Sequence, residues 1–201
     1  RIRDLMIVDA LAATNANSIL REFPDDQLER MRTQATNIGA ANLSRCADIA
    51  AEGVDVSLAK RVNSYTGAMV RNPGKSAPVE LSYLRKGSAA STIEPADILD
   101  TYISSTRWLH VTGITCAISQ SGANTVKIAL EKAAAMNIKS SFDLNIRRKL
   151  WSEEDAKKVL APLAKNVDLL IGGEDEYQAV FGAQEPKNVL AEANKRGCKI
   201  A

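Results

Sequence analysis

The sequence contains one short stretch in which an amide and several basic side chains follow an apolar, strand-like run. It reads "FDLNIRRKLW" and covers residues 142–151. Asn145 is followed at close spacing by Arg147, Arg148 and Lys149. Guanidinium groups bind carboxylates and phosphates through bidentate, charge-assisted hydrogen bonds. The stretch is therefore either a solvated basic loop or a binding site for an anion.

Composition limits the classes of protein that need to be considered. The 201 residues suffice for one domain with a real core, and 45% hydrophobic with 25% charged residues is typical of a soluble globular protein. The net charge of +2, with both signs interspersed, does not indicate a nucleic-acid partner. No apolar run reaches membrane-spanning length and no secretion signal opens the sequence, so we expect no membrane partner and a cytoplasmic location.

Cysteine and histidine usage argues against several kinds of site. The three cysteines are far apart and odd in number, which favours neither a metal knuckle nor a disulfide framework. Cys116 has no nearby base in the pattern and is not expected to act as a nucleophile. His110 is the only histidine, which excludes a His-rich metal site, and its place in "WLHVTG" predicts a packed strand residue.

Strand and helix patterns alternate from about Thr106 onward. Short loops and apolar strand runs predict an α/β fold, a Rossmann-like parallel sheet with helices on both faces. Ligands of such sheets bind beyond the carboxyl ends of the strands, where residues 145–149 and the acidic run after Ile171 are expected. The predicted segments are strands "RWLHVTG", "IKSSFDL" and "VDLLIG", and helices "SGANTVKIALEKAAAMN", "SEEDAKKVLAPLAKN", "EDEYQAVFG" and "PKNVLAEANKRG".

The first half of the chain divides into two further segments. Residues 62–91 contain two extended runs separated by the turn-rich "PGKSAP", which predicts a β-hairpin set apart from the core as a lid. Residues 1–61 have a mostly helical pattern, although "DLMIVDAL" fits either a strand or a buried helical turn, and residues 1–35 match no known element. Residues 92–201 form the predicted α/β core.

Four segments carry a resemblance to a known family. They are "VELSYLRKGSAASTIEPADI", "WLHVTGITCAIS", "FDLNIRRKLWSEEDAKKVL" and "VDLLIGGEDEYQAVFG", in this order. Together they resemble the ribokinase-like (PfkB-type) carbohydrate kinases, and within them the 2-keto-3-deoxygluconate kinases, from about residue 52 to residue 201. The resemblance implies a ribokinase-like core with a small β lid, here in truncated form. It also implies ATP-dependent phosphorylation of a hydroxyl on 2-keto-3-deoxygluconate or a related sugar acid.

The family motifs assign expected roles to particular residues. Tyr83 and Arg85 match a Y-x-R element whose side chains face the substrate. Arg147 matches the Arg of D-x-N-x-R, which reaches the substrate carboxylate and lies near the ATP phosphates, and Asn145 falls close to the nucleotide. Met69 stands at a lid position that is often aromatic in relatives, which puts a stacking role in doubt.

The resemblance also implies ATP and Mg²⁺ as cofactors. Glu176 matches the Glu of an N-x-x-E element that organises Mg²⁺ through water, although Gly173 stands where the Asn usually is. The catalytic base of the family lies in a Gly-Ala-Gly-Asp turn, and no such turn occurs in this sequence. We expect that base beyond Ala201, so the sequence is interpreted as a fragment that is inactive by itself.

Alternative interpretations remain at this point. The substrate could be a neutral sugar such as fructose, or a nucleoside, although two arginines favour an acid. The chain could instead be a non-catalytic ligand-binding relative, or it could associate as a homo-oligomer through the edge of the lid hairpin. Among individual residues, Arg148 and Lys149 are expected at the surface, Tyr83 and Met69 could serve packing, and the two tryptophans are expected in the core.

Overall fold

The computed structural model divides the chain into two compact units, each considered by itself. Unit 1 comprises residues 1–3 and 10–90, and unit 2 comprises residues 4–9 and 91–201. The predicted helices before residue 53 and after residue 182 lie almost wholly outside the described residues. The structure describes residues 5–7, 51, 53, 55–56, 59, 62–65, 67–72, 80–165, 167–182, 188, 191, 195 and 198.

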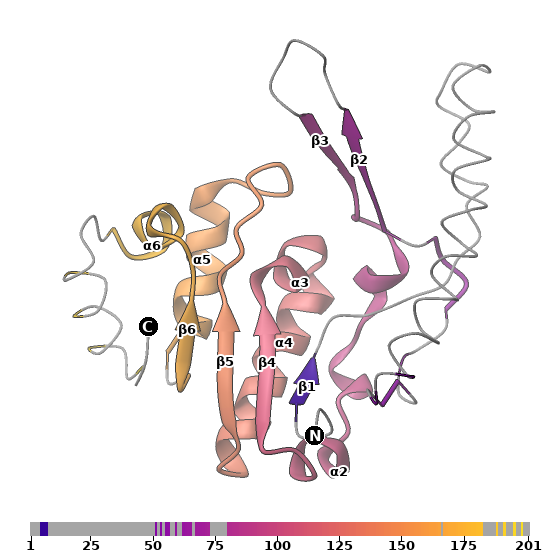
Figure 1. Cartoon of the computed structure of the whole chain (residues 1–201), viewed down its shortest axis with the longest axis vertical. Helices are drawn as coiled ribbons and strands as arrows, with labels where there is room; N and C mark the ends of the chain where they lie inside the picture. The colour runs from indigo at the N-terminus through magenta and orange to yellow at the C-terminus, as the bar shows by residue number, and fades with distance from the viewer. Residues whose placement is uncertain are drawn as a thin grey trace. The chain divides into compact units, whose positions relative to one another are not determined.

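Unit 2 is built on a parallel sheet with the strand order β1-β4-β5-β6 (Figure 1). The parallel arrangement agrees with the fold class predicted from strand and helix alternation. The short "LMI" run, for which the sequence allowed a strand or a helical turn, is a strand that pairs with β4. The strands are β1 (Leu5–Ile7), β4 (Trp108–Thr112), β5 (Lys139–Asp143) and β6 (Leu169–Ile171).

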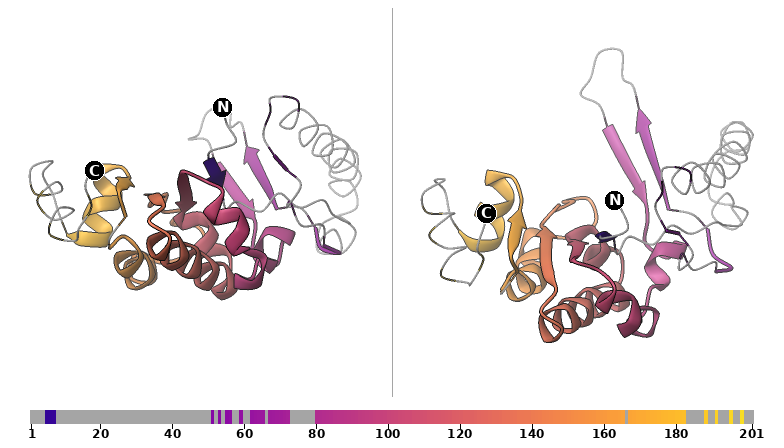
Figure 2. Two further views of the ribbon diagram at one scale, coloured as in Figure 1. Left: turned by 90° about the horizontal axis from the view of Figure 1, so that it is seen from below. Right: turned by 60° about the horizontal axis from the view of Figure 1, so that its bottom comes forward.

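One face of this sheet carries the core of unit 2. Leu109, Val111 and Phe142 are fully buried, and Leu170 is nearly so. Two further views show α3, α4 and α5 gathered on one side of the strands (Figure 2). Alternate residues of each strand point to the same face, so apolar side chains at every second position make this packing possible. The helices of unit 2 are α2 (Asp100–Ser104), α3 (Gly113–Ile118), α4 (Gln120–Ala135), α5 (Glu153–Leu163) and α6 (Glu174–Phe181), and two short 3₁₀ turns, Ala89–Thr92 and Pro95–Asp97, precede them.

The opposite face of β4 and β5 is more polar. Trp108 Nε1 donates to Ser141 Oγ at 2.8 Å, and His110 Nδ1 lies 2.8 Å from the same oxygen. Both ring side chains are half-buried, and Ser141 is buried. His110 is therefore a hydrogen-bonded strand residue, as its sequence context predicted.

Helix starts follow the expected capping chemistry. Ser152 precedes α5, and its Oγ accepts a hydrogen bond from the Asp155 N–H at 3.1 Å, while Glu153, Glu154 and Asp155 occupy the first turn. Acids in a first turn are stabilised by the partial positive charge of the helix N-terminus. The end of α6 is set by Gly182, whose φ of 74° is the left-handed conformation that glycine adopts without steric cost.

Unit 1 contains the hairpin that the alternating pattern of residues 62–91 predicted. Strands β2 (Ala68–Asn72) and β3 (Glu80–Leu84) pair antiparallel, with Met69 opposite Tyr83. The chain on either side of the hairpin is joined by the Ala89 N–H, which donates to the carbonyl of Tyr65 at 2.8 Å. This bond fixes the base of the hairpin.

A close backbone approach connects the ends of β4 and β5. A Cβ atom on Gly113, at the start of α3, would lie only 2.0 Å from the carbonyl oxygen of Leu144. Leu144 is itself held, because its N–H donates to the Ile171 carbonyl at 2.9 Å. Only glycine allows α3 to begin this close to the chain leaving β5.

Replacement of Gly113 by alanine should therefore destabilise the fold. We expect a loss of about 2–3 kcal/mol in the free energy of unfolding, because the added methyl group must displace backbone. Gly173→Ala is the matched control, since the added Cβ there would meet only the flexible carboxylate of Asp175, at 2.8 Å. Urea unfolding of both variants measures the difference, and equal unfolding midpoints would contradict the steric explanation.

Candidate functional site

The polar residues singled out in the second half of the sequence gather at the carboxyl end of the sheet in unit 2. The chain leaves β5 at Asp143 and continues through residues 144–152, here called the β5–α5 loop, to α5. It leaves β6 at Ile171 and reaches α6 through two glycines. Carboxyl ends of neighbouring parallel strands meet at one edge, so Asn145, Arg147 and Glu176 belong to one region, as the sequence predicted.

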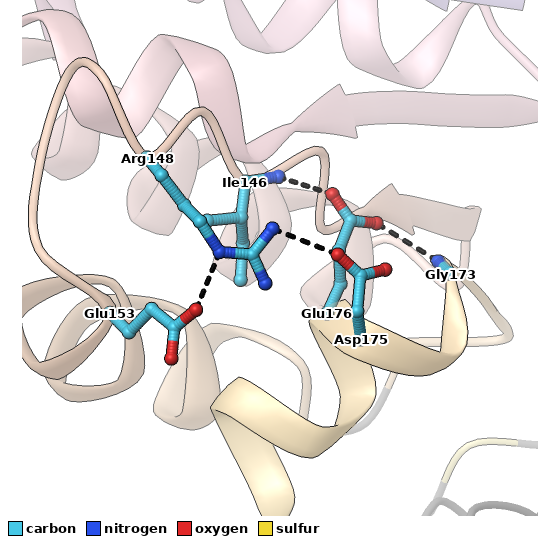
Figure 3. Close-up of polar contacts among 6 residues, drawn as sticks. All are labelled: Ile146, Arg148, Glu153, Gly173, Asp175 and Glu176. Atoms are coloured by element: carbon cyan, nitrogen blue, oxygen red, sulfur yellow. Dashed lines mark hydrogen bonds and ion pairs between the residues drawn. The ribbon is translucent and has the colours of Figure 1, made fainter.

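Glu176 joins the β5–α5 loop to the start of α6. Its Oε1 accepts a hydrogen bond from the Ile146 N–H at 2.5 Å, and its Oε2 accepts one from the Gly173 N–H at 3.0 Å (Figure 3). Gly173 precedes α6, so the second bond also caps that helix. The sequence predicted a metal-related role for Glu176 and missed this link, because a capping acid carries no signal of which other loop it contacts.

The two neighbouring arginines of the loop have different environments. Arg148 is 49% exposed, and its guanidinium pairs with Glu153 Oε1 at 2.5 Å and with Asp175 Oδ2 at 2.8 Å (Figure 3). Arg147 is half-buried, and its guanidinium makes no hydrogen bond or ion pair within the part of the chain that the structure describes. Its one marked interaction is attraction to the carboxylate of Asp143. Arg147 is therefore the cation available to an anionic ligand.

Asn145 adopts an uncommon backbone conformation. Its φ of 41° is in the left-handed region, which asparagine tolerates better than most residues. Its Nδ2 lies 3.5 Å from Thr112 Oγ1 at the end of β4, which is a long and weak contact. The amide is thus only lightly engaged by protein and remains able to bind a second partner.

Asp143 is a member of this region that the sequence analysis did not select. Burial raises the pKa of its carboxyl group above 3.8, and the charge of Glu176 raises it further. His110, the Asn145 N–H and Arg147 act in the opposite direction and stabilise the charged form. An acid placed directly at the carboxyl end of a buried strand was the sequence signal that could have identified it.

The remaining predicted residues form a group of their own in unit 1. The guanidinium carbon of Arg85 lies 5.4 Å from the centre of the Tyr83 ring, a cation–π contact between the two residues of the Y-x-R element. Both side chains are half-buried. Met69 is paired with Tyr83 through the backbone of the hairpin, and its side chain lies outside the described residues.

Two other kinds of site receive no support from the described parts of the chain, namely a metal ion held directly by a cluster of side chains and a cysteine nucleophile. Those parts contain no group of three or more His, Cys, Asp or Glu side chains that could hold a metal ion. Cys116 is buried, and burial raises the pKa of its thiol to about 12, so it carries no thiolate at neutral pH.

None of the helices described is long and apolar enough to cross a membrane.

The raised pKa of Asp143 predicts a pH-dependent effect on stability. The folded state binds this proton more tightly than the unfolded chain, so the charged carboxylate destabilises the fold once the pH exceeds the ordinary value of 3.8. Asp143→Asn should therefore raise the urea midpoint at neutral pH, and the gain should vanish as the pH falls below that value.

Asp175→Asn provides a control of opposite sign. Hydrogen bonding to Arg148 lowers the pKa of Asp175, so its charged form stabilises the fold at neutral pH and this contribution is lost on acidification. A gain for Asp143→Asn that persists unchanged at low pH would contradict the electrostatic explanation.

Comparison with known proteins gives the same fold and a family. Residues 45–200 match the pfkB family of carbohydrate kinases. Over 127 residues the chain is 35% identical to 2-dehydro-3-deoxygluconokinase of Thermoproteus tenax, which covers 62% of this chain and 37% of that protein. The chain thus spans less than half the length of this curated relative.

Solved structures share the architecture. The crystal structure of 2-dehydro-3-deoxygluconokinase from Thermotoga maritima superposes with a TM-score of 0.71 at 24% identity, covering 95% of this chain and 54% of that one. A putative ribokinase II from E. coli, in complex with ATP and Mg²⁺, has a TM-score of 0.69 at 18% identity, covering 93% and 52%. These likenesses confirm the predicted ribokinase-like α/β fold class. Since the family match extends over more than half of its residues, the chain belongs to the pfkB family of carbohydrate kinases.

Proposed function

We propose that this chain is part of an ATP-dependent sugar kinase whose substrate is 2-keto-3-deoxygluconate, also named 2-dehydro-3-deoxygluconate, or a related sugar acid. The observation that carries the proposal is Arg147, a half-buried guanidinium with no hydrogen bond or ion pair to the described residues, at the carboxyl end of β5. An unpaired cation that is half removed from water binds an anion strongly, because much of its desolvation has already occurred. The carboxylate of a sugar acid and the phosphates of ATP are both such anions.

Phosphoryl transfer makes demands that the residues of this region can meet in part. The reaction depends on placing the sugar hydroxyl in line with the transferred phosphate and on compensating the charge of the phosphate oxygens. In this proposal Arg147 supplies positive charge to the substrate carboxylate and lies near the phosphates, and the lightly engaged amide of Asn145 donates to the nucleotide.

The fit of a magnesium ion depends on Glu176. Each of its carboxylate oxygens accepts one backbone N–H and retains a further acceptor site, so the side chain could bind a water molecule of a hydrated ion without releasing either loop. Bound Mg²⁺ would supply charge compensation for the ATP phosphates. We therefore propose ATP and Mg²⁺ as cofactors, with Glu176 acting through water.

One feature of unit 1 supports an acidic substrate. Arg85, with its guanidinium over the Tyr83 ring, is a second cation on a residue pair that matches the substrate-facing element of sugar-acid kinases. We propose that Tyr83, Arg85 and Met69 contact the substrate. We also propose that the edge of the β2–β3 hairpin pairs with a second copy of the protein, since an edge strand presents unpaired backbone groups.

A substrate panel tests the proposed activity. The whole protein that carries this sequence should release ADP from ATP with 2-keto-3-deoxygluconate or 2-keto-3-deoxygalactonate, and less efficiently with fructose or a nucleoside. The 201 residues by themselves contain no Gly-Ala-Gly-Asp turn and should show no turnover. A preference of the whole protein for neutral sugars would reject the acid assignment, and turnover by the 201 residues would reject the proposal that the base lies elsewhere.

Removal of the Arg147 guanidinium tests its role. Arg147→Ala in the whole protein should lower kcat/KM for the sugar acid roughly 10- to 100-fold, since a hydrogen bond to a charged group contributes ~1.5–3 kcal/mol. Lys158→Ala is the control, because among the described residues Lys158 pairs only with Glu154, on the exposed surface of α5. If the two variants had equal kcat/KM values, Arg147 would not be a ligand-binding residue.

A further inference from the structure

The β5–α5 loop is held at alternate residues. The backbone N–H of Ile146 is bound by Glu176, and the side chain of Arg148 is bound by Glu153 and Asp175. Asn145 and Arg147, which the proposed function assigns to ligands, are the residues next to these two anchors. Fixing positions 146 and 148 restricts the backbone of residue 147 from both sides.

The Arg148 anchor spans two helices. Glu153 lies in the first turn of α5, and Asp175 lies in the first turn of α6. Arg148 Nε donates to one carboxylate and its Nη1 donates to the other, so a single planar guanidinium sets the distance between the two helix starts (Figure 3). A lysine could not do this, because its ammonium is a point charge without the fixed fork of donors.

We propose that Arg148 is a positioning residue, whose guanidinium pairs at once with Glu153 and Asp175 and thereby holds the β5–α5 loop in the shape that presents Arg147 to an anionic ligand. The identity of the ligand rests on the proposed function, whereas the claim that Arg148 holds the loop does not depend on it. Arg148 lies at the surface as the sequence predicted, with a side chain that is 49% exposed, and the proposal adds a positioning role to that location.

The charges around the loop make the anchor more than an ordinary surface ion pair. The first turns of α5 and α6 together carry six acids, which would repel an anion approaching this edge of the sheet. Arg148 compensates one unit of this negative charge while it pairs with a carboxylate on each helix. An isolated exposed pair contributes ~0–1 kcal/mol, but one guanidinium shared by two carboxylates forms a network, the case in which surface pairing has a measurable effect. The six acids are Glu153, Glu154, Asp155, Glu174, Asp175 and Glu176.

Two substitutions separate positioning from charge. Arg148→Gln removes both the charge and the double pairing, and Arg148→Lys keeps the charge but cannot reproduce the two directed bonds. Lys158→Gln, which breaks the exposed Lys158–Glu154 pair on α5, is the matched control for loss of an ordinary ion pair. All three variants are made in the whole protein that carries this sequence.

The first measurement is amide hydrogen exchange of the β5–α5 loop without ligand. We expect Arg148→Gln and Arg148→Lys to raise exchange of Ile146 and its neighbours about three- to tenfold, since local opening is governed by such contacts. The Lys158→Gln control should leave this exchange unchanged. Unchanged exchange in Arg148→Gln, or wild-type exchange in Arg148→Lys, would overturn the inference.

The second measurement is steady-state kinetics with 2-keto-3-deoxygluconate and ATP. A positioning role predicts that both Arg148 variants raise KM about three- to tenfold for at least one of these anions while kcat changes less. A variant that merely unfolds would lower kcat together with the amount of folded protein, and KM would stay constant, which would count against the inference. If the wild-type protein phosphorylates no sugar acid, the proposed function fails, and hydrogen exchange still decides whether Arg148 holds the loop.

Discussion

The arrangement at the carboxyl end of the sheet depends on the carboxylate of Glu176. Backbone groups that leave parallel strands lose the partners that the sheet provided, and a buried N–H without an acceptor costs about 1–3 kcal/mol. The carboxylate of Glu176 accepts hydrogen bonds from the backbone N–H groups of Ile146 and Gly173. One side chain thus supplies an acceptor to each of two loops. These two hydrogen bonds couple the β5–α5 loop to the start of α6. They therefore restrict the backbone that carries Asn145 and Arg147, the residues proposed to bind ligands.

The fixed position of the β5–α5 loop explains how the adjacent residues Arg147 and Arg148 can have different roles. Arg148 pairs with two carboxylates, whereas among the described residues the Arg147 guanidinium has only a long-range attraction to Asp143. If both guanidiniums were paired, neither would be left for a ligand, and if neither were paired, their mutual repulsion would destabilise the loop. The ion pairs of Arg148 keep the loop ordered, and the half-buried, open guanidinium of Arg147 gives it affinity for an anion. Asp143 moderates the open cation without forming a direct ion pair that a ligand would have to break.

The sequence predicted the parallel sheet of unit 2 and the position of its carboxyl end, because apolar strand runs and capped helices are local signals. It also placed Asn145, Arg147 and Glu176 at one edge, since the topology of a parallel sheet requires it. It could not predict that Ile146 donates to Glu176, or that Arg148 joins Glu153 to Asp175. Those bonds join segments up to about thirty residues apart, and each donor and acceptor has many equally plausible partners in the sequence.

Asp143 shows why a local pattern was insufficient for the site itself. Burial and the nearby charge of Glu176 both oppose ionisation of its carboxyl group, and neither effect can be read from the neighbouring residues in the sequence. The fold tolerates this cost because Asp143 also accepts from the Asn145 N–H and attracts Arg147, two interactions that help shape the loop. Polar groups kept in unfavourable surroundings are common at functional sites, where stability is exchanged for geometry. The carboxylate of Asp143 and the guanidinium of Arg147 therefore act together. Their attraction reduces the free-energy cost of keeping each charge partly buried.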